Sequence, residues 1–388
     1  MLKKLFLSDP YRILFLSGAF FSIAGSGLWI LFSLNLIENY PLKAHMQIMV
    51  LGFLYSYVAG FLMTAVPRMT ATNAATLNEK YTAVILVWTF FITSLLGFDK
   101  INNVCSIFLF LFLIVFIFRR RLKMKSKSLA PGFVFIPAGL MCGLVGSMLL
   151  CFERDLFPGS LKLGKLMLNE GFVLNLIIGL GSRLIPMLSK KIGAISPLDV
   201  KDVDKKLILF QGFLFNGSFF VEVYLDQQLA YFIRLIVLIS VSIWNFKLLK
   251  PMYESSKQGI GLILVGLIIP TAYLLLLIFP QHRVHLIHLL YIGGFSLVTY
   301  LISVRVSLAH GGGPLSLEKT STDLACFIIF FLLSMVMRVS IPILPDINLF
   351  YVFAAAAAVY ILAVFMWVKL LIKYLWINDS TTPASSSC

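Results

Sequence analysis

The stretch of sequence that decides the fold is residues 101–118, INNVCSIFLFLFLIVFIF, which is followed at once by Arg119, Arg120 and Arg121. A largely apolar run of about 18 residues is long enough to cross the hydrocarbon core of a bilayer as a helix. Arginines directly after such a run are typical of its cytoplasmic side. The stretch therefore predicts a transmembrane helix that ends at the cytoplasm.

The rest of the chain has a similar composition. Of its 388 residues 60% are hydrophobic and only 13% are charged, whereas soluble domains average about 25% charged residues. The mean hydropathy is +0.95. A chain this apolar would expose its surface to water only at a large cost in free energy, so lipid is the expected solvent. We predict an all-α membrane protein.

Apolar runs long enough to span a bilayer recur about twelve times, with no soluble domain between them. They lie at residues 11–34, 44–67, 81–98, 101–118, 130–152, 165–189, 207–225, 228–249, 258–279, 284–309, 321–342 and 347–376. We therefore predict one polytopic transmembrane domain over residues 1–378. The polar tail over residues 379–388 is predicted to be disordered.

The charged residues predict the orientation of these helices. With the N-terminus inside, 21 Lys and Arg residues fall on the inner side and 6 on the outer side. This asymmetry obeys the positive-inside rule and predicts that both termini lie in the cytoplasm, with the protein in a bacterial inner membrane. The net charge of +15 is spread over short loops instead of one soluble module, which argues against nucleic acid as a partner.

One coarse regularity recurs at every fourth helix. Predicted helices two, six and ten each end at the inner face with polar residues combined with Pro or Gly, at residues 64–68, 181–186 and 305–314. The recurrence suggests three arcs of four helices. Pro and Gly also end helices at an interface for simple conformational reasons, which would explain the signature without a repeat.

The histidines occur on only two predicted helices, and all five are His45, His282, His285, His288 and His310. His45 begins helix two, and His282, His285 and His288 begin helix ten, so four of the five share a depth near the outer leaflet. His285 and His288 lie about one turn apart on one face. If helices two and ten touch, His45 can oppose one of them.

Two imidazoles that face each other from neighbouring helices can hold the iron of a b-type haem, and neutral imidazole also binds copper or zinc. Ionisable groups within a membrane are functional by default, so we predict ligation by His45 with His288 or His285. For His282 we favour simple hydrogen bonding at the interface. His310 is a further metal-ligand candidate, although the three glycines after it could simply cap the helix.

Several ionisable residues within apolar runs need partners. Arg183 and Arg305 lie near the inner face, where a haem propionate, an anionic lipid or snorkelling to the interface could satisfy them. Arg234 and Arg338 lie nearer the outer face, and either could pair with a propionate. The few acidic residues within helices, chiefly Glu170 and Glu222, give thin support for proton-coupled transport.

Three segments of the chain resemble the NnrS family, membrane proteins described as carrying haem and copper and tied to the nitric-oxide response. The segments are His45 with the block AGFLMTAVP at residues 59–67; Gly181, Arg183, Pro186 and Met187; and His288, Gly293, Arg305, His310 and Gly311. The resemblance covers nearly the whole chain. It implies a haem b between helices two and ten, with Arg183 and Arg305 among its binding residues. It also implies nitric oxide or a redox protein as a partner.

The chain departs from the pattern of the family at the first motif. The family usually has His-x-His-Glu-Met, whereas this chain has Gln47 and Ile48 in place of the second histidine and the acid. These departures argue against a second, copper-containing centre. The arrangement is also similar to the catalytic subunit of haem-copper oxidases, in which helices two and ten hold a haem, but helices six and seven here lack the histidines that bind copper there.

The sequence therefore predicts an NnrS-like membrane protein that binds haem b between helices two and ten and acts in nitric-oxide stress or redox chemistry. Whether it catalyses a reaction is left open. A solute transporter without a cofactor is one alternative, and it would keep its activity without His45 and His288. A partner that delivers metal or haem to another protein is a second alternative.

Overall fold

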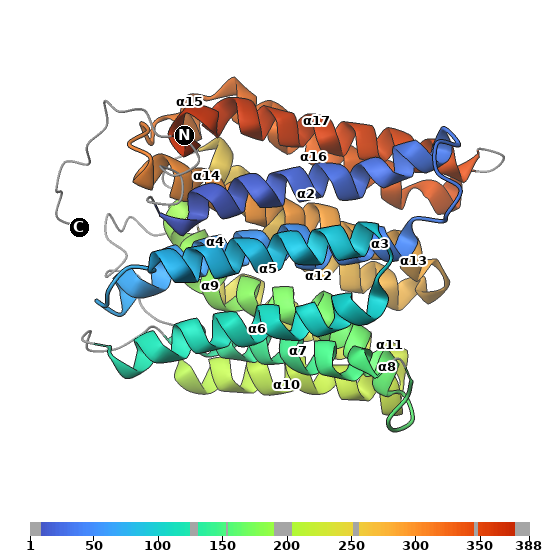
Figure 1. Cartoon of the computed structure of the whole chain (residues 1–388). Coiled ribbons are helices and arrows are strands. Elements are labelled where there is room, and N and C mark those ends of the chain that lie inside the picture. The colour runs from blue at the N-terminus through green and yellow to red at the C-terminus, as the bar shows by residue number, and fades with distance from the viewer. Residues whose placement is uncertain are drawn as a thin grey trace.

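The computed structural model describes residues 9–124, 131–152, 154–189, 204–250, 256–344 and 348–376. All regular secondary structure in these residues is helical, and the long helices run side by side in one bundle (Figure 1). This confirms the predicted all-α class. The predicted tail over residues 379–388 lies outside the described residues.

Eleven helical runs within the described residues are long and apolar enough to cross a membrane. They are α2 (Pro10–Ser33), α3 to α4 (Leu42–Met69), α6 (Asp99–Leu122), η2 and α7 (Pro131–Cys151), α8 to α9 (Ser160–Leu188), α10 (Lys205–Tyr224), α11 and η5 (Gln227–Asn245), α12 (Lys257–Ile278), η6 to α14 (Pro280–His310), α16 (Thr322–Val339) and α17 (Leu349–Leu375). The multi-pass membrane architecture is thereby confirmed.

The remaining long helix is α5 (Leu77–Leu95), which occupies the position of the third predicted span and packs beside α6 in the bundle (Figure 1). Its first turn is polar because it carries a capping box, in which the Thr76 hydroxyl accepts from the Glu79 amide and the Glu79 carboxylate accepts from the Thr76 amide. The same carboxylate pairs with Arg120 of α6 at 2.8 Å. Each of the twelve predicted runs thus has a helix.

Three of the long helical runs share an internal design. Each consists of a short helix, a π-helical segment and a longer helix: α3 (Leu42–Gln47), η1 (Ile48–Leu54) and α4 (Tyr55–Met69); α8 (Ser160–Leu166), η3 (Met167–Gly171) and α9 (Phe172–Leu188); and α13 (Arg283–His288), η7 (Leu289–Ser296) and α14 (Leu297–His310). These are predicted helices two, six and ten. A π-helical segment adds a residue to a turn and is frequent at functional sites.

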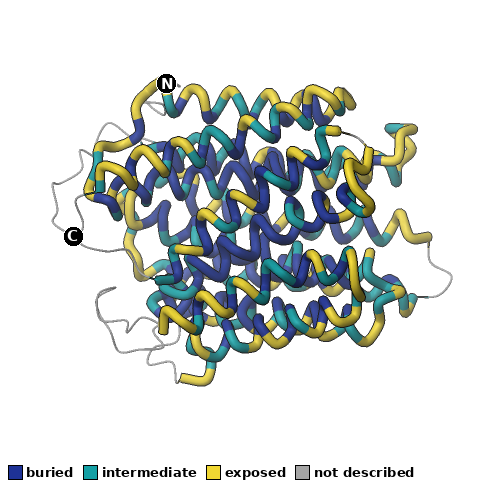
Figure 2. Tube along the Cα trace, turned by 90° about the horizontal axis from the view of Figure 1, so that it is seen from below, coloured by how far each residue is buried: buried dark blue, intermediate teal, exposed yellow. Residues whose placement is uncertain are grey.

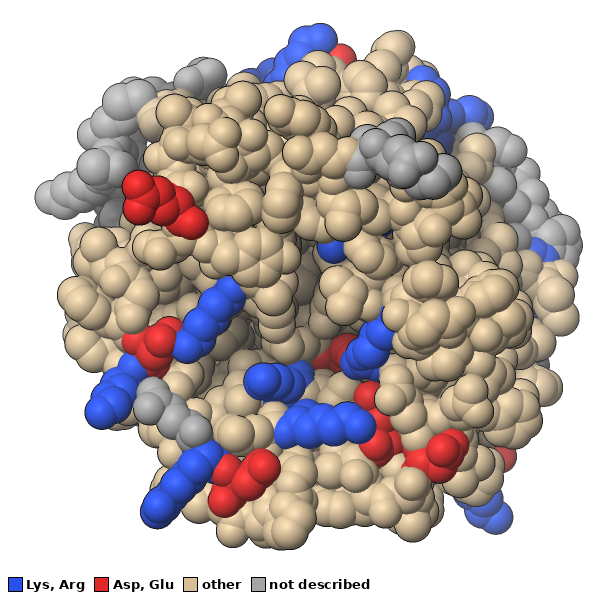
Figure 3. All heavy atoms as spheres, turned by 90° about the vertical axis from the view of Figure 1, so that its right-hand side faces the viewer, with Lys and Arg blue, Asp and Glu red and all other residues tan. Residues whose placement is uncertain are grey.

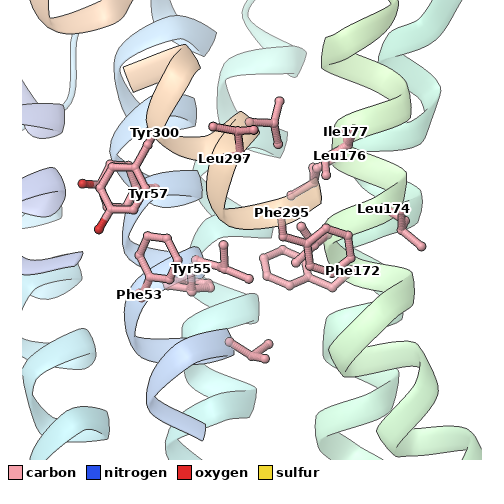
Figure 4. Close-up of a cluster of buried hydrophobic side chains, with 14 of the residues drawn as sticks. Phe53, Tyr55, Tyr57, Phe172, Leu174, Leu176, Ile177, Phe295, Leu297 and Tyr300 are labelled. Carbon is pink, nitrogen blue, oxygen red and sulfur yellow. The ribbon is translucent and has the colours of Figure 1, made fainter. Parts of the chain in front are cut away.

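The same three runs form the interior of the bundle. Their apolar windows are 78%, 72% and 72% buried, against 33–56% for the other spans, and the most buried backbone follows the middle of the bundle (Figure 2). Figure 4 shows aromatic side chains of all three meeting there. Phe53 stacks on Tyr300 at 5.2 Å between ring centroids, and Tyr55 lies 6.4 Å from Phe172. This recurrence at every fourth helix agrees with three arcs of four.

Close backbone contact fixes the position of the α8–α9 run. A Cβ atom on Gly139 of α7 would lie 2.7 Å from the Phe172 carbonyl oxygen, and one on Gly146 would lie 2.8 Å from the Gly164 carbonyl oxygen. Small residues at such positions let helix backbones approach within a membrane, where packing and not water drives association. The array closes because the last helix, α17, packs against the first, α2.

Candidate cofactor cavity

A cavity of about 380 Å³ lies at the end of the bundle where α3, α8 and α13 begin, which we call the cavity end. The opposite end, where α2 begins and α17 ends, we call the terminal end. The space-filling view of the cavity end shows a hollow with Lys, Arg, Asp and Glu side chains beside it (Figure 3). Its size is within the range of small-molecule and cofactor sites, about 300–1,000 Å³.

His45 lines this cavity from α3. Its Nδ1 lies 2.9 Å from the carbonyl oxygen of Gly25 on α2. A carbonyl can only accept a hydrogen bond, so Nδ1 carries the proton and Nε2 of the neutral ring keeps a lone pair. Trp29 packs edge-on against the ring, with 5.6 Å between centroids. The fold therefore fixes both the tautomer and the tilt of this imidazole.

His288 lines the same cavity from the last position of α13. Its Nδ1 lies 2.9 Å from the carbonyl oxygen of Val284, one turn earlier in its own helix. The argument made for His45 applies, so Nε2 again keeps the lone pair. The two imidazoles therefore line one cavity from two different helical runs. A backbone carbonyl that holds Nδ1–H is the usual outer partner of a histidine that binds metal through Nε2.

His285 has a different environment from His288. Its Nδ1 lies 2.7 Å from Nη1 of Arg338 on α16, and a guanidinium can only donate. Nδ1 of His285 is therefore the accepting nitrogen, which leaves the proton on Nε2. Neither His285 nor His282 belongs to the residues that line the cavity. The structure thus brings His45 together with His288, whereas the sequence left His285 and His288 as alternatives.

The other predicted site residues lie toward the terminal end. Arg183 is in the last turns of α9, and Arg305 of α14 pairs with Glu318 at 2.7 Å. His310 ends α14, where its ring nitrogens lie 2.7 and 2.9 Å from Nη1 of Arg68. Twenty-two residues of helix separate His310 from His288, which at about 1.5 Å per residue is roughly 30 Å. These three residues do not line the cavity.

The cavity walls are mostly aromatic and apolar. The lining side chains include Trp29, Tyr40, Phe53, Tyr291, Phe353 and Tyr360. Among the described residues, no three His, Cys, Asp or Glu side chains converge to form a metal site. The described cavity wall therefore offers two imidazoles, one from each of two interior helical runs, together with the Glu170 carboxylate.

A comparison with protein-family models supports the resemblance seen in the sequence. The model described as NnrS protein matches residues 5–378, which is nearly the whole chain. This chain belongs to the NnrS family. The match includes both histidines of the cavity and the helices that carry them. A search of curated proteins gives no match.

This NnrS-family chain also has a buried charge cluster beside the cavity that sequence reasoning did not assemble. Nη1 of Arg234 on α11 lies 2.5 Å from a carboxylate oxygen of Glu222 on α10, and Nη2 of Arg283 lies 2.7 Å from Glu170 of η3. Arg283 also reaches Glu222 at 3.3 Å, and the Tyr273 hydroxyl donates to Glu170 at 2.7 Å. The sequence shows these groups separately on five helical runs, so no spacing pattern connects them.

The cluster contributes to the cavity as well as to the fold. Glu170 and Arg283 lie in the cavity wall, while Arg234 and Glu222 are almost completely buried behind them. Charges inside a membrane protein are stable only when they are paired and hydrogen-bonded. The two ion pairs therefore hold α10, α11 and α13 against the α8–α9 run and place one neutralised Glu–Arg pair beside the histidines.

Proposed function

We propose that this NnrS-family protein binds a b-type haem in the cavity, with Nε2 of His45 and Nε2 of His288 as the iron ligands, and acts in the response to nitric oxide or in redox chemistry. The observation that carries the proposal is the shared tautomer. Both imidazoles line one cavity, and each donates Nδ1–H to a backbone carbonyl at 2.9 Å, which leaves Nε2 with its lone pair.

The surroundings fit such a group. The cavity offers aromatic and apolar walls to a flat macrocycle, and Lys165 and Arg338 supply positive charge for its carboxylates. When bound, haem would supply one-electron redox chemistry and an iron centre that reacts with nitric oxide. The backbone carbonyls of Gly25 and Val284 orient the two imidazoles. The aromatic walls of the cavity limit the access of water to them.

We also propose that the terminal end faces the cytoplasm and the cavity end faces the periplasm of a bacterial inner membrane. The support is the excess of Lys and Arg in the segments on the N-terminal side of the membrane. In this orientation nitric oxide or a periplasmic redox partner reaches the cavity without crossing the bundle. Labelling of single cysteines introduced at Leu36 and Met124, one at each end, tests the assignment.

The haem proposal is tested on protein purified from cells supplied with a haem precursor. The wild type is expected to show a Soret band and six-coordinate low-spin α and β bands when reduced. His45→Ala and His288→Ala are each expected to lose more than about nine-tenths of the haem or to become high-spin, because one axial ligand is removed. His282→Ala and His285→Ala are the matched controls and are expected to keep the spectrum.

A second measurement addresses the biological role. A deletion strain is expected to grow more slowly under a nitric-oxide donor, and the wild-type gene but not His288→Ala should restore growth. Absence of a Soret band in the wild type would refute haem binding. A Soret band with normal growth of the deletion strain would refute the nitric-oxide role and leave redox chemistry.

A further inference from the structure

Arg338 is a buried cation without an anionic partner in the described part of the chain. It lies in the last turn of α16, is only 9% exposed and forms part of the cavity wall. Its guanidinium lies 4.3 Å from the centre of the Phe353 ring and donates from Nη1 to His285. Among the described residues, no carboxylate approaches it within ion-pair distance.

Two other arginines near the cavity, Arg234 and Arg283, show what Arg338 lacks. Arg234 and Arg283 each contact carboxylates of both Glu170 and Glu222. The two glutamates thus neutralise two arginines and leave none for Arg338. A guanidinium withdrawn from water without a counter-charge is strongly unfavourable. Arg338 therefore needs an anion that the described protein does not supply.

The charge of the whole cavity wall leads to the same requirement. Its charged side chains are three cations, Lys165, Arg283 and Arg338, and one carboxylate, Glu170. The wall therefore carries two positive charges in excess. Lys165 is exposed and Arg283 is already paired, so the unmatched charge that is withdrawn from solvent is that of Arg338. A ligand that bears two carboxylates would balance this excess.

We propose that Arg338 is the carboxylate-binding residue of the cavity and pairs with one propionate of the bound haem; this rests on the function proposed above. Of the five N–H groups of a guanidinium, the hydrogen bond to His285 uses one. The rest are available for the two-point pairing that arginine makes with a carboxylate. His285 is then a positioning residue, because it holds the guanidinium in place from outside the cavity. His285 thus has a role other than metal ligation.

The test changes the charge on both sides of the pair. Wild type, Arg338→Gln and Arg338→Lys are titrated in neutral detergent with haem b and with its dimethyl ester, which lacks both carboxylates, and the dissociation constant is read from the Soret band. Arg338→Gln is expected to weaken binding of haem b by about ten- to a hundredfold, which corresponds to the loss of a charged hydrogen-bonded pair. It should change binding of the ester by less than about threefold. Arg338→Lys should recover part of the loss because it keeps the charge.

Two matched variants complete the design. His285→Ala removes the partner of Arg338 but not its charge, so the variant should still prefer haem b over the ester. Arg68→Gln removes an exposed arginine at the terminal end and controls for expression and handling. If Arg338→Gln weakened the binding of haem b and of the ester equally, Arg338 would have only a structural role, and the inference would be overturned.

The remaining outcomes separate this inference from the function on which it rests. If the wild type binds haem b and the ester equally, the carboxylate subsite is refuted and haem binding stands. If the wild type binds neither, haem binding itself is refuted. If Arg338→Gln instead lowers retention of phosphatidylglycerol and leaves both haem titrations unchanged, the anion is a lipid phosphate and the inference is overturned.

Discussion

The α3–α4 and α13–α14 runs carry histidines at both ends of the bundle, and the surroundings of these histidines differ between the two ends. At the cavity end, His45 and His288 line the cavity, and each holds a backbone carbonyl through Nδ1. At the terminal end, His310 faces the guanidinium of Arg68, which pairs with Asp9 at 3.1 Å. Histidine on these helices is therefore not sufficient for a binding site. Two features decide whether such a histidine can bind a ligand. One is the group that contacts Nδ1, and the other is whether the ring lines a cavity.

The ion pairs of the two ends differ in the same way. At the cavity end, Arg234 and Glu222 have side chains that are 0% and 1% exposed. At the terminal end, Arg305 and Glu318 are 26% and 9% exposed, and Arg68 and Asp9 are 48% and 33% exposed. Because solvent screens a charge left without its partner, the effect of breaking each pair should fall in this order.

The largest effect is expected from Glu222→Gln at the cavity end. The change leaves Arg234 buried and short of one negative charge, which in other proteins costs about 3–5 kcal/mol of stability. The variant should unfold at a much lower temperature than the wild type in detergent, as measured by a fluorescence or light-scattering melt. The double variant Glu222→Gln, Arg234→Met is the control and should regain part of the loss, because no buried charge is left unpaired.

A melting temperature of Glu222→Gln within experimental error of the wild type would refute the claim that the buried ion pairs of the cavity end contribute most to stability. It would mean that water or another group solvates Arg234. The double variant would then be expected to melt below the single one, since it would lose packing and remove no unpaired charge.

An intermediate effect is expected from Glu318→Gln near the terminal end. Arg305 keeps partial access to solvent, so the loss should be about 1 kcal/mol and the shift of the melting temperature smaller than for Glu222→Gln. Asp323→Asn, which breaks the exposed pair with Lys369 at 2.8 Å, is the matched control and should shift it less still. A larger shift for Glu318→Gln than for Glu222→Gln would reverse the proposed order of the two ends.

These contrasts show which parts of the molecule can be predicted from sequence. The helices could be predicted because each has to satisfy its own backbone hydrogen bonds in lipid, which imposes long apolar runs. The approach of His45 and His288 could be predicted because both begin helices that run in the same direction. That His288 lines the cavity while His285 contacts Arg338 could not, since Arg338 lies 53 residues after His285, at a position that no helical spacing relates to it.

The buried cluster of Glu170, Glu222, Arg234 and Arg283 was beyond sequence reasoning for a related physical reason. Each residue is a single charge in an otherwise apolar run, and its partner is set by how four helical runs pack. The Pro and Gly signature at the ends of predicted helices two, six and ten did reflect a real recurrence. The structure adds that each of these helices also has a π-helical segment near its other end, which the sequence does not mark.

The smallest effect is expected from His310→Ala. The side chain is exposed, and its contact with Arg68 joins two groups that water solvates well, so its removal should change stability by no more than about 0.5 kcal/mol. The ratio of Soret to protein absorbance should stay at the wild-type value, whereas His288→Ala should lower it strongly. Loss of haem from His310→Ala, with the melting temperature unchanged, would place a ligand at the terminal end. A single haem could not then be shared with His45, because the two ends are separated by the length of α14 and its π-helical segment, and the comparison between the ends would fail.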